Sequence, residues 1–299
     1  MGRDGERLPI EEIEPLRFVW CELTSLCNLA CRHCYADSGP YGNHGTMTVL
    51  DWCCVLEEAA ALGALDVQFI GGEPTLHPGL PALVRHALGL GLQVEVFSNL
   101  VKVREPLWET FQLPGVRLAT SYYSPDPSEH DMVTGRHSHD QTLANIREAV
   151  QRNIPLRVGV IQVEDRQRAR GAVDELKALG VAKVDFDVRR AVGRSARGMA
   201  PDVGQLCGHC ADGSLAVSPN GEVWPCVFSR WLIIGNAREC SLAELHVRAQ
   251  PARTELASAF ADRISRRCSP DDGGCTPAPC EPIITCSPQK GSSIAGAAQ

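Results

Sequence analysis

Short apolar runs alternate with helical segments from residue 18 to about residue 195, and this alternation limits the possible folds more than any other feature. The apolar runs cover 18–24, 65–71, 93–98, 116–122, 156–163 and 183–190. Helical character lies between most of them, at 48–62, 79–90, 139–152 and 165–179, and more weakly at 102–111. Strands separated by helices are typical of a parallel sheet with helices packed outside it. Six such units predict an α/β fold, a partial (β/α)6 TIM-like barrel with its chemistry at the carboxyl ends of the strands.

The pattern changes after residue 195. Residues 214–226 (SLAVSPNGEVWPC) predict a hairpin around Asn220-Gly221, a strong turn signal, and residues 241–263 predict a helix. From residue 268 the sequence is rich in Pro, Gly and Cys, so we expect bound metal to fix it in place of a hydrophobic core. The predicted division is an N-terminal extension 1–17, the barrel 18–195, a small Cys-rich auxiliary-cluster domain 196–290 and a disordered tail 291–299.

The chain has 14 cysteines, and none of them lies between Cys54 and Cys207. No apolar run is long enough to span a bilayer, and the first residues lack the apolar region of a signal peptide. We therefore expect a cytoplasmic protein whose clustered cysteines bind metal instead of forming disulfides. The formal charge of −7 argues against a nucleic-acid partner.

The first cysteine cluster follows the first predicted strand. Cys27, Cys31 and Cys34 have the spacing C-x3-C-x2-C. Three thiolates can bind three irons of a [4Fe–4S] cluster and leave the fourth iron open for an outside ligand. A structural zinc site normally has four protein ligands. The alternative to the cluster is a zinc site, for which His33 would supply the fourth ligand beside the three cysteines.

Residues 27–35, CNLACRHCY, resemble the CxxxCxxC-plus-aromatic signature of the radical S-adenosylmethionine (radical SAM) superfamily. The resemblance implies that the open iron binds S-adenosylmethionine. It also implies that an electron from the cluster cleaves this cofactor to a 5′-deoxyadenosyl radical, which takes hydrogen from the substrate. Tyr35 matches the family's aromatic residue next to the adenine. Electrons would come from a donor protein of the flavodoxin or ferredoxin type.

A second motif at a strand end supports the resemblance. Gly71-Gly72-Glu73-Pro74 resembles the family's GGEP motif, which holds the methionine amino group. Glycine allows close approach of the backbone, and a carboxylate pairs with an ammonium group. Ser98 and Asn99, which end the third predicted strand, resemble the pair that contacts the ribose.

Further matches follow the later strands. Ser121 ends the fourth strand as a second polar contact, and 124–136 (SPDPSEHDMVTGR) resembles the family's loop after that strand. Arg136 in this loop could meet the methionine carboxylate, or it could be a solvated surface arginine. Ile161 matches an apolar residue that packs against adenine, and Arg189 or Arg194 could line the site.

The second cysteine zone fits the opening of SPASM and twitch extensions, which hold auxiliary iron–sulfur clusters. Cys210, Gly221 and Cys226 match the pattern C-x(9–15)-G-x(4)-C, and Cys207 is close enough to join them. In the allocation that we favour, these three cysteines and one late cysteine hold a single cluster. In the other, the four late cysteines hold a second auxiliary cluster. The late cysteines are Cys268, Cys275, Cys280 and Cys286.

The remaining cysteines have different expected roles. A spare thiol facing the site could donate a hydrogen atom to a substrate radical, and the candidates are Cys240 and Cys268. An isolated cysteine such as Cys240 is more often a small buried apolar residue. Cys53 and Cys54 are predicted to pack in the first helix, and Cys21 to point into the core.

The cofactor motifs leave the substrate open among natural-product enzymes, which we expect here to be of the actinobacterial type. Only 17 residues precede the first strand, too few for a domain that grips a peptide, so a small substrate is favoured. We therefore predict epimerisation of a carbon in an aminoglycoside-like molecule, with a cysteine as hydrogen donor. The alternatives are maturation of a ribosomally made peptide, by cross-linking or epimerisation, and a non-catalytic iron–sulfur protein. Acidic side chains near strand ends would suit a polycation: Glu73, Glu95, Asp126, Glu129, Asp131, Asp185 and Asp187.

Overall fold

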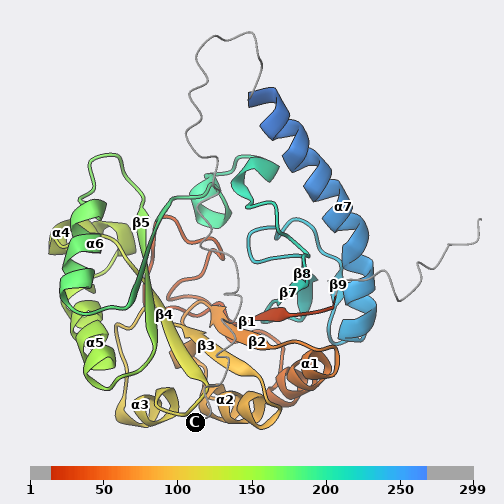
Figure 1. Ribbon diagram of the computed structural model, residues 1–299, viewed down its shortest axis with the longest axis horizontal. Helices are drawn as coiled ribbons and strands as arrows, with labels where there is room; N and C mark the ends of the chain where they lie inside the picture. Colours follow the sequence, from red (N-terminus) through yellow and green to blue (C-terminus); the bar gives the residue numbers. More distant parts are fainter. Residues whose placement is uncertain (1–14, 268–299) are drawn as a thin grey trace, which may run out of the picture.

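A computed structural model describes residues 15–267 of the protein. Six parallel strands form a curved sheet in the order β6-β5-β4-β3-β2-β1, which confirms the predicted partial barrel (Figure 1). Each strand falls within one of the apolar runs. Their bounds are β1 Phe18–Thr24, β2 Asp66–Gly71, β3 Gln93–Phe97, β4 Val116–Tyr122, β5 Leu156–Gln162 and β6 Lys183–Val188.

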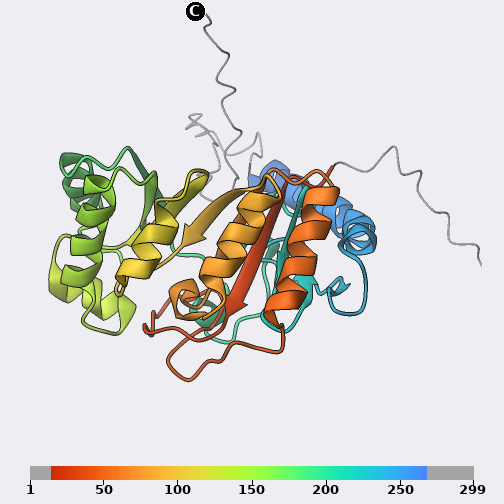
Figure 2. The same ribbon diagram turned by 90° about the horizontal axis from the view of Figure 1, so that it is seen from below.

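The helices of the barrel cover the convex side of this sheet (Figures 1 and 2). Large side chains from both layers, such as Trp52 and Phe69, are fully buried between them. The strands read as continuous apolar runs because this outer face is packed and the inner face lines a cavity. The helices are α1 Val49–Ala61, α2 Leu80–Gly89, α3 Glu105–Phe111, α4 Pro127–Thr134, α5 His139–Gln151 and α6 Ala169–Ala178.

The predicted hairpin extends the barrel sheet at its β1 edge. Strands β7 (Ser214–Val217) and β8 (Glu222–Trp224) pair antiparallel around Asn220-Gly221, and β9 (Gly235–Asn236) follows β8. Strand β7 pairs in parallel with β1, so β1 belongs to the wall of the barrel and also anchors the second cysteine zone. Helix α7 (Leu242–Arg267) lies beside this part of the sheet (Figure 1).

One element differs from the prediction. The segment after β4 is not only a loop, because it contains α4. The Asp126 side chain caps this helix by accepting from the Glu129 N–H at 3.0 Å, and Pro127 occupies the first turn. Both features are helix-start signals that the loop assignment overlooked.

The cysteines outside the two clusters pack unequally. Cys21 is buried in the core, as predicted. Cys53 packs partly against the same core, but Cys54 is exposed, so the prediction that both would pack was wrong for Cys54. Cys54 lies on the side of α1 that faces away from the sheet. Among the helices of residues 15–267, none has the length and apolar character needed to cross a membrane.

Candidate active site

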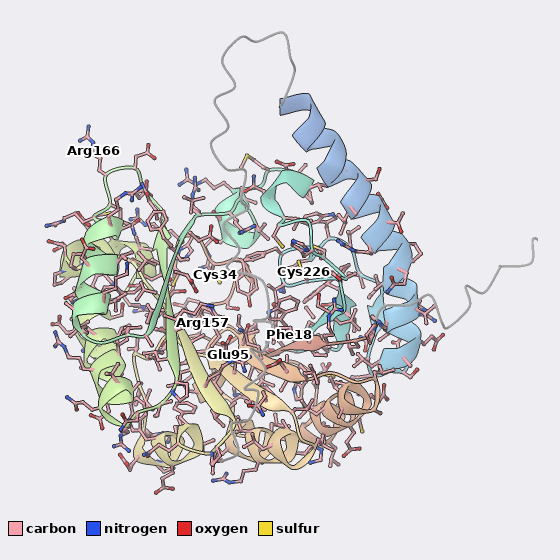
Figure 3. The ribbon with its side chains drawn as sticks, in the orientation of Figure 1. Phe18, Cys34, Glu95, Arg157, Arg166 and Cys226 are labelled. Atoms are coloured by element: carbon pink, nitrogen blue, oxygen red, sulfur yellow. The ribbon has the colours of Figure 1, made fainter. Side chains whose placement is uncertain are left out.

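The loop that carries Cys27, Cys31 and Cys34 follows β1 and lies on the concave side of the sheet. All three cysteines line one cavity of about 260 Å³ inside the ring of strands. Figure 3 shows Cys34 in the middle of this ring. None of the three forms a disulfide, so their sulfur atoms are available as ligands.

The sulfur atoms of this loop fit a cationic centre. Backbone N–H groups donate to two of them, from Leu29 to Cys27 Sγ at 3.4 Å and from Ser38 to Cys34 Sγ at 3.3 Å. Burial raises the pKa of Cys27 to about 12, and it also raises the pKa of Cys31 and of Cys34. Ligation deprotonates thiols, and hydrogen bonds to sulfur tune iron–sulfur clusters. Three largely buried thiols, two of them with N–H partners, therefore match the chemistry of an iron–sulfur cluster.

Arg194 holds the cysteine loop from outside the cavity. Its guanidinium donates to the carbonyl oxygens of Cys31 and Ser38, each at 2.7 Å, and to Asp37 Oδ1 at 3.0 Å. Its backbone N–H donates to the Cys34 carbonyl at 2.9 Å. Backbone carbonyls on both sides of the loop are thus fixed by one side chain. Of the two arginines predicted to line the site, Arg194 does not line the cavity.

The Gly71-Gly72 pair ends β2 against the start of the cysteine loop. Gly71 has a φ of +121°, and a Cβ there would lie 2.6 Å from the Thr24 carbonyl, so the position requires glycine. The N–H groups of Gly72 and Glu73 donate to Thr24 and Leu26 at 2.6 and 2.9 Å. The motif is therefore tied to the segment that leads into the cysteine loop, and both glycines line the cavity.

Glu73 lies behind the cavity wall. Its carboxylate accepts from Thr75 N and Oγ1 at 3.0 and 2.7 Å, and from Ser98 Oγ and Asn99 N at 2.8 Å each. Burial raises the pKa of Glu73, and these hydrogen bonds oppose that rise. Glu73, Pro74 and Ser98 are not among the residues that line the cavity. The Ser98 hydroxyl, predicted to contact the ribose, is instead bound to Glu73.

Several other predicted cofactor contacts do lie in the cavity wall. Asn99 Nδ2 donates to Asn28 Oδ1 at 2.7 Å and lies 3.8 Å from Cys27 Sγ. Arg136 is exposed and does not line the cavity, which matches the alternative of a solvated arginine. The predicted residues in the wall are Tyr35, Asn99, Ser121, Ile161 and Arg189.

Three rings beside the cysteine loop form a part of the wall that the sequence did not reveal. His33 meets the Tyr123 ring edge-on with 5.1 Å between centroids, and Tyr123 meets His130 in the same way at 5.2 Å. Burial, followed by the charge of Arg189, lowers the pKa of His33 to about 4, so its imidazole is neutral. Within residues 15–267, no three His, Cys, Asp or Glu side chains converge as ligands of a single metal ion would. His33 is a packing residue here, and the Cys3His zinc alternative is not formed.

The floor of the cavity holds a buried charge network that also escaped the sequence reading. Glu95 of β3 accepts from Arg157 at 2.7 and 2.9 Å and from Arg117 at 3.2 Å. Gln68 of β2 also donates to it. Burial alone would raise the pKa of Glu95, but Arg157 and Arg117 hold it below its usual range. Figure 3 shows Glu95 and Arg157 side by side near Cys34.

The acidic side chains predicted to bind a polycation form ion pairs or hydrogen bonds with other residues of the chain. Asp126 and Glu129 pair with Arg168 on the outer side of the barrel. Asp187 pairs with Arg190 at 3.4 Å, and other chain groups surround Glu73, Glu95, Asp131 and Asp185. The argument for a polycationic substrate was therefore wrong. The count of acidic residues near strand ends did not reveal the bases that pair with them.

The second cysteine site lies at the end of the β7–β8 hairpin. Cys210 and Cys226 are buried with their sulfur atoms 3.2 Å apart, and the Cys210 thiol lowers the pKa of Cys226. Cys207 is close enough to act on the charge of Cys226. Cys210 and Cys226 are thus in contact, and a cluster held jointly with Cys207 stays a prediction. Cys268, Cys275, Cys280 and Cys286 lie outside the described residues, so the two allocations of ligands stay open.

Of the two predicted hydrogen donors, the structure describes only Cys240. Cys240 packs against the main core and does not line the cavity, in keeping with its alternative role as a small apolar residue. Cys268 lies outside the described residues. Among the described residues, the cysteines that line the cavity are the three predicted cluster ligands.

Comparison with known proteins agrees with this geometry. The model of the radical SAM superfamily matches residues 21–188, and that of an iron–sulfur cluster-binding domain, SPASM, matches residues 207–271. The chain belongs to the radical SAM superfamily. It is an enzyme of this superfamily with a SPASM region, and its cofactors are [4Fe–4S] clusters, catalytic and auxiliary, and S-adenosylmethionine.

Two curated relatives match part of the chain. The PqqA peptide cyclase of Xanthomonas campestris pv. campestris (strain B100) is 31% identical over 176 residues, which cover 58% of this chain and 47% of the relative. The sporulation killing factor maturation protein SkfB of Bacillus subtilis (strain 168) is 34% identical over 142 residues, covering 46% and 34%. The chain thus spans less than half the length of either relative. Neither comes from an actinobacterium, so the expected actinobacterial type gains no support.

Solved structures show the same fold at low identity. Streptococcus suis SuiB bound to S-adenosylmethionine superposes with a TM-score of 0.66 at 15% identity, covering 78% of this chain and 65% of SuiB. The structure of anSMEcpe with bound AdoMet and the Cp18Cys peptide gives a TM-score of 0.59 at 14% identity, covering 77% and 80%. At these identities the likeness concerns the fold.

Proposed function

We propose that this enzyme matures a peptide, and that it forms an oxidative cross-link. The observation that carries the proposal is the activity of two curated relatives, a PqqA peptide cyclase and a killing-factor maturation protein. The alignment to the cyclase spans 176 residues at 31% identity. Peptide maturation, the alternative in the sequence analysis, thus replaces the small-molecule epimerisation.

The charges of the cavity support this choice over an amino sugar. Its acidic residues are paired within the chain, with Glu95 held by two arginines. Basic side chains outnumber carboxylates in the lining, five to three. A polycation would meet net repulsion there, because like charges repel strongly away from bulk water. The basic lining residues are Arg117, Arg157, Lys183, Arg189 and Arg190, and the carboxylates are Glu95, Asp185 and Asp187.

The two candidate reactions make different demands on the thiols of the cavity. Epimerisation needs a hydrogen donor on the second face of the substrate carbon, whereas an oxidative cross-link needs none. In the part of the chain that the structure describes, Cys27, Cys31 and Cys34 are the thiols that line the cavity, and they are the predicted iron ligands. Cys240 lies in the core instead.

The residues of the chain prepare the site for this chemistry. When bound, the cluster and S-adenosylmethionine supply a radical that removes hydrogen from a carbon. Cys27, Cys31 and Cys34 hold the cluster, and Asn99 lies against Cys27. The apolar rings of the cavity wall include Trp20 and the partly buried Phe228. They exclude water from the reacting carbon.

The test is turnover of a peptide under anaerobic conditions. Protein reconstituted with iron and sulfide is mixed with dithionite, S-adenosylmethionine and the short peptide encoded nearest to its gene. We expect the peptide to lose the mass of a pair of hydrogen atoms and 5′-deoxyadenosine to appear in equal amount. One hydrogen atom would leave in 5′-deoxyadenosine, and the other would leave as a proton while its electron passes to an iron–sulfur cluster of the enzyme. Cys27→Ala protein serves as the matched control and should give neither product.

Turnover in D2O separates the proposal from its rival. A cross-linked peptide gains no deuterium on carbon, whereas an epimerised substrate gains one atom from an exchangeable donor. The proposal fails if the peptide stays unmodified while an aminoglycoside takes up deuterium. The cross-link part of the proposal fails if the peptide keeps its number of hydrogen atoms and gains deuterium on carbon.

A further inference from the structure

Arg230 lies between the two cysteine sites. Its Nη1 donates to both carboxylate oxygens of Glu22, at 2.6 and 2.7 Å. Its guanidinium stacks over the Trp224 ring at 4.1 Å and lies 6.0 Å from the centre of the Tyr35 ring. Glu22 belongs to β1, Tyr35 directly follows Cys34, and Trp224 ends β8. One side chain thus joins the wall of the cavity to the auxiliary hairpin.

The other end of this link is fixed to the auxiliary cysteine. Arg230 comes four residues after Cys226, in a tight turn. The Ser229 hydroxyl accepts from the Cys226 N–H at 3.0 Å and donates to its carbonyl at 3.1 Å. The Phe228 N–H donates to Cys226 Sγ at 3.4 Å, and the Phe228 ring meets Tyr35 edge-on at 5.4 Å. A change in the position of Cys226 therefore moves both Phe228 and Arg230.

The Glu22 carboxylate makes this link hard to replace. Glu22 is 1% exposed, so without Arg230 its charge would be buried and uncompensated. The planar guanidinium also serves two partners at once, since it forms the ion pair with Glu22 and stacks on the Trp224 ring. A loss of order at Cys226 would thus reach Tyr35 through Arg230 and also through the Phe228 ring.

We propose that Arg230 is a positioning residue that couples the auxiliary site to the S-adenosylmethionine site, by holding Tyr35 in the cavity wall while it is anchored in the Cys226 turn. The proposal concerns cofactor binding and holds for any substrate. It predicts that damage at Cys226 and loss of Arg230 weaken cofactor binding through the same contact.

The test is a double-mutant cycle on the affinity for S-adenosylmethionine, measured by equilibrium dialysis with oxidised, iron-loaded protein. Arg230→Met and Cys226→Ala should each raise the Kd by about tenfold, which lies within the usual range of coupling between two sites. The double variant should be no weaker than the weaker single variant, because both changes break one coupling. Factors that multiply in the double variant would overturn the proposal, as would a Kd within twofold of wild type for Arg230→Met.

Two further variants separate positioning from mere charge compensation. Arg230→Lys keeps a cation beside Glu22 but loses the planar stack on Trp224. We therefore expect its Tm to recover from that of Arg230→Met towards the wild-type value, while its Kd stays several-fold above wild type. Recovery of both quantities would overturn the proposal. If Arg230→Met does not fold, Glu22→Gln with Arg230→Met leaves no buried charge and takes its place in the cycle. The matched control is Arg248→Met, which breaks an exposed ion pair with Glu244 on α7 and should leave the Kd unchanged.

Discussion

The two cysteine sites differ in what holds their ligands in place. The first loop is tied to the barrel by bonds that involve no metal. The Ala30 and Arg32 N–H groups donate to the carbonyls of Thr134 and Val133 at the end of α4, at 2.9 and 3.1 Å. Arg194 fixes three further oxygen atoms around it. At the second site, the described ties include the hairpin, the Ser229 turn, the Arg230–Glu22 ion pair and the approach of Cys210 to Cys226.

We infer from this difference that the fold alone builds the first site, whereas the second site depends more on its metal. The first loop keeps its shape through hydrogen bonds, so removing iron should cost activity but little stability. At the second site, a cluster would itself join segments distant in sequence, so its binding energy is part of the folding energy. Substitutions at the two sites should therefore affect different measured quantities.

The largest effect is expected from Cys27→Ala. The variant should lose the iron of its catalytic cluster, about four atoms per chain. Formation of 5′-deoxyadenosine with dithionite should fall to background, while the Tm should change by only a few degrees. Iron analysis, chromatographic assay of the nucleoside and thermal unfolding measure the three quantities. Cys54→Ala, at an exposed cysteine of α1, is the matched control and should behave as wild type. Equal nucleoside formation by Cys27→Ala and wild type would contradict the assignment of the cluster.

A smaller loss of activity is expected from Arg194→Met. The change removes three side-chain hydrogen bonds around the cysteine loop, each worth about 1 kcal/mol. A chelator should then extract the catalytic iron at least about tenfold faster, and nucleoside formation should fall by a similar factor. Arg166→Met is the control, because Arg166 is exposed on a loop far from the cavity (Figure 3). Extraction at the wild-type rate would mean that the loop is held without Arg194.

For thermal stability, we expect a change at the second site to have a larger effect than a change at the first. Cys226→Ala should lower the Tm by several degrees more than Cys27→Ala, because loss of the auxiliary metal unties the hairpin end. Its catalytic iron should remain, so nucleoside formation should persist at a reduced rate. A Tm loss no larger than that of Cys27→Ala would show that the second site is also built by the fold alone.

Local patterns were enough to predict the strands, the cysteine loop and the hairpin, since each depends on neighbouring residues. Contacts across the sheet were not predictable in this way. Glu95 and Arg157 are 62 positions apart, and Glu22 and Arg230 are 208 apart. In the sequence, a charged residue inside a strand looks the same whether it faces solvent or an opposite charge. The register between strands decides that, and register is a property of the folded sheet.

The smallest effect is expected at Arg136, a residue whose match to the family suggested a cofactor contact. Its side chain is exposed and outside the cavity lining, so Arg136→Ala should leave the Kd for S-adenosylmethionine within about twofold and the Tm within experimental error. Asn99→Ala is the comparison, because Asn99 lines the cavity and bonds to Asn28 beside Cys27. That variant should bind the cofactor more weakly. If Arg136→Ala instead weakens binding as much as Asn99→Ala, the segment after α4 must close over the cavity when the cofactor binds. The hydrogen bonds of the first site would then not be enough to form it, because part of its wall would take its place only with the cofactor.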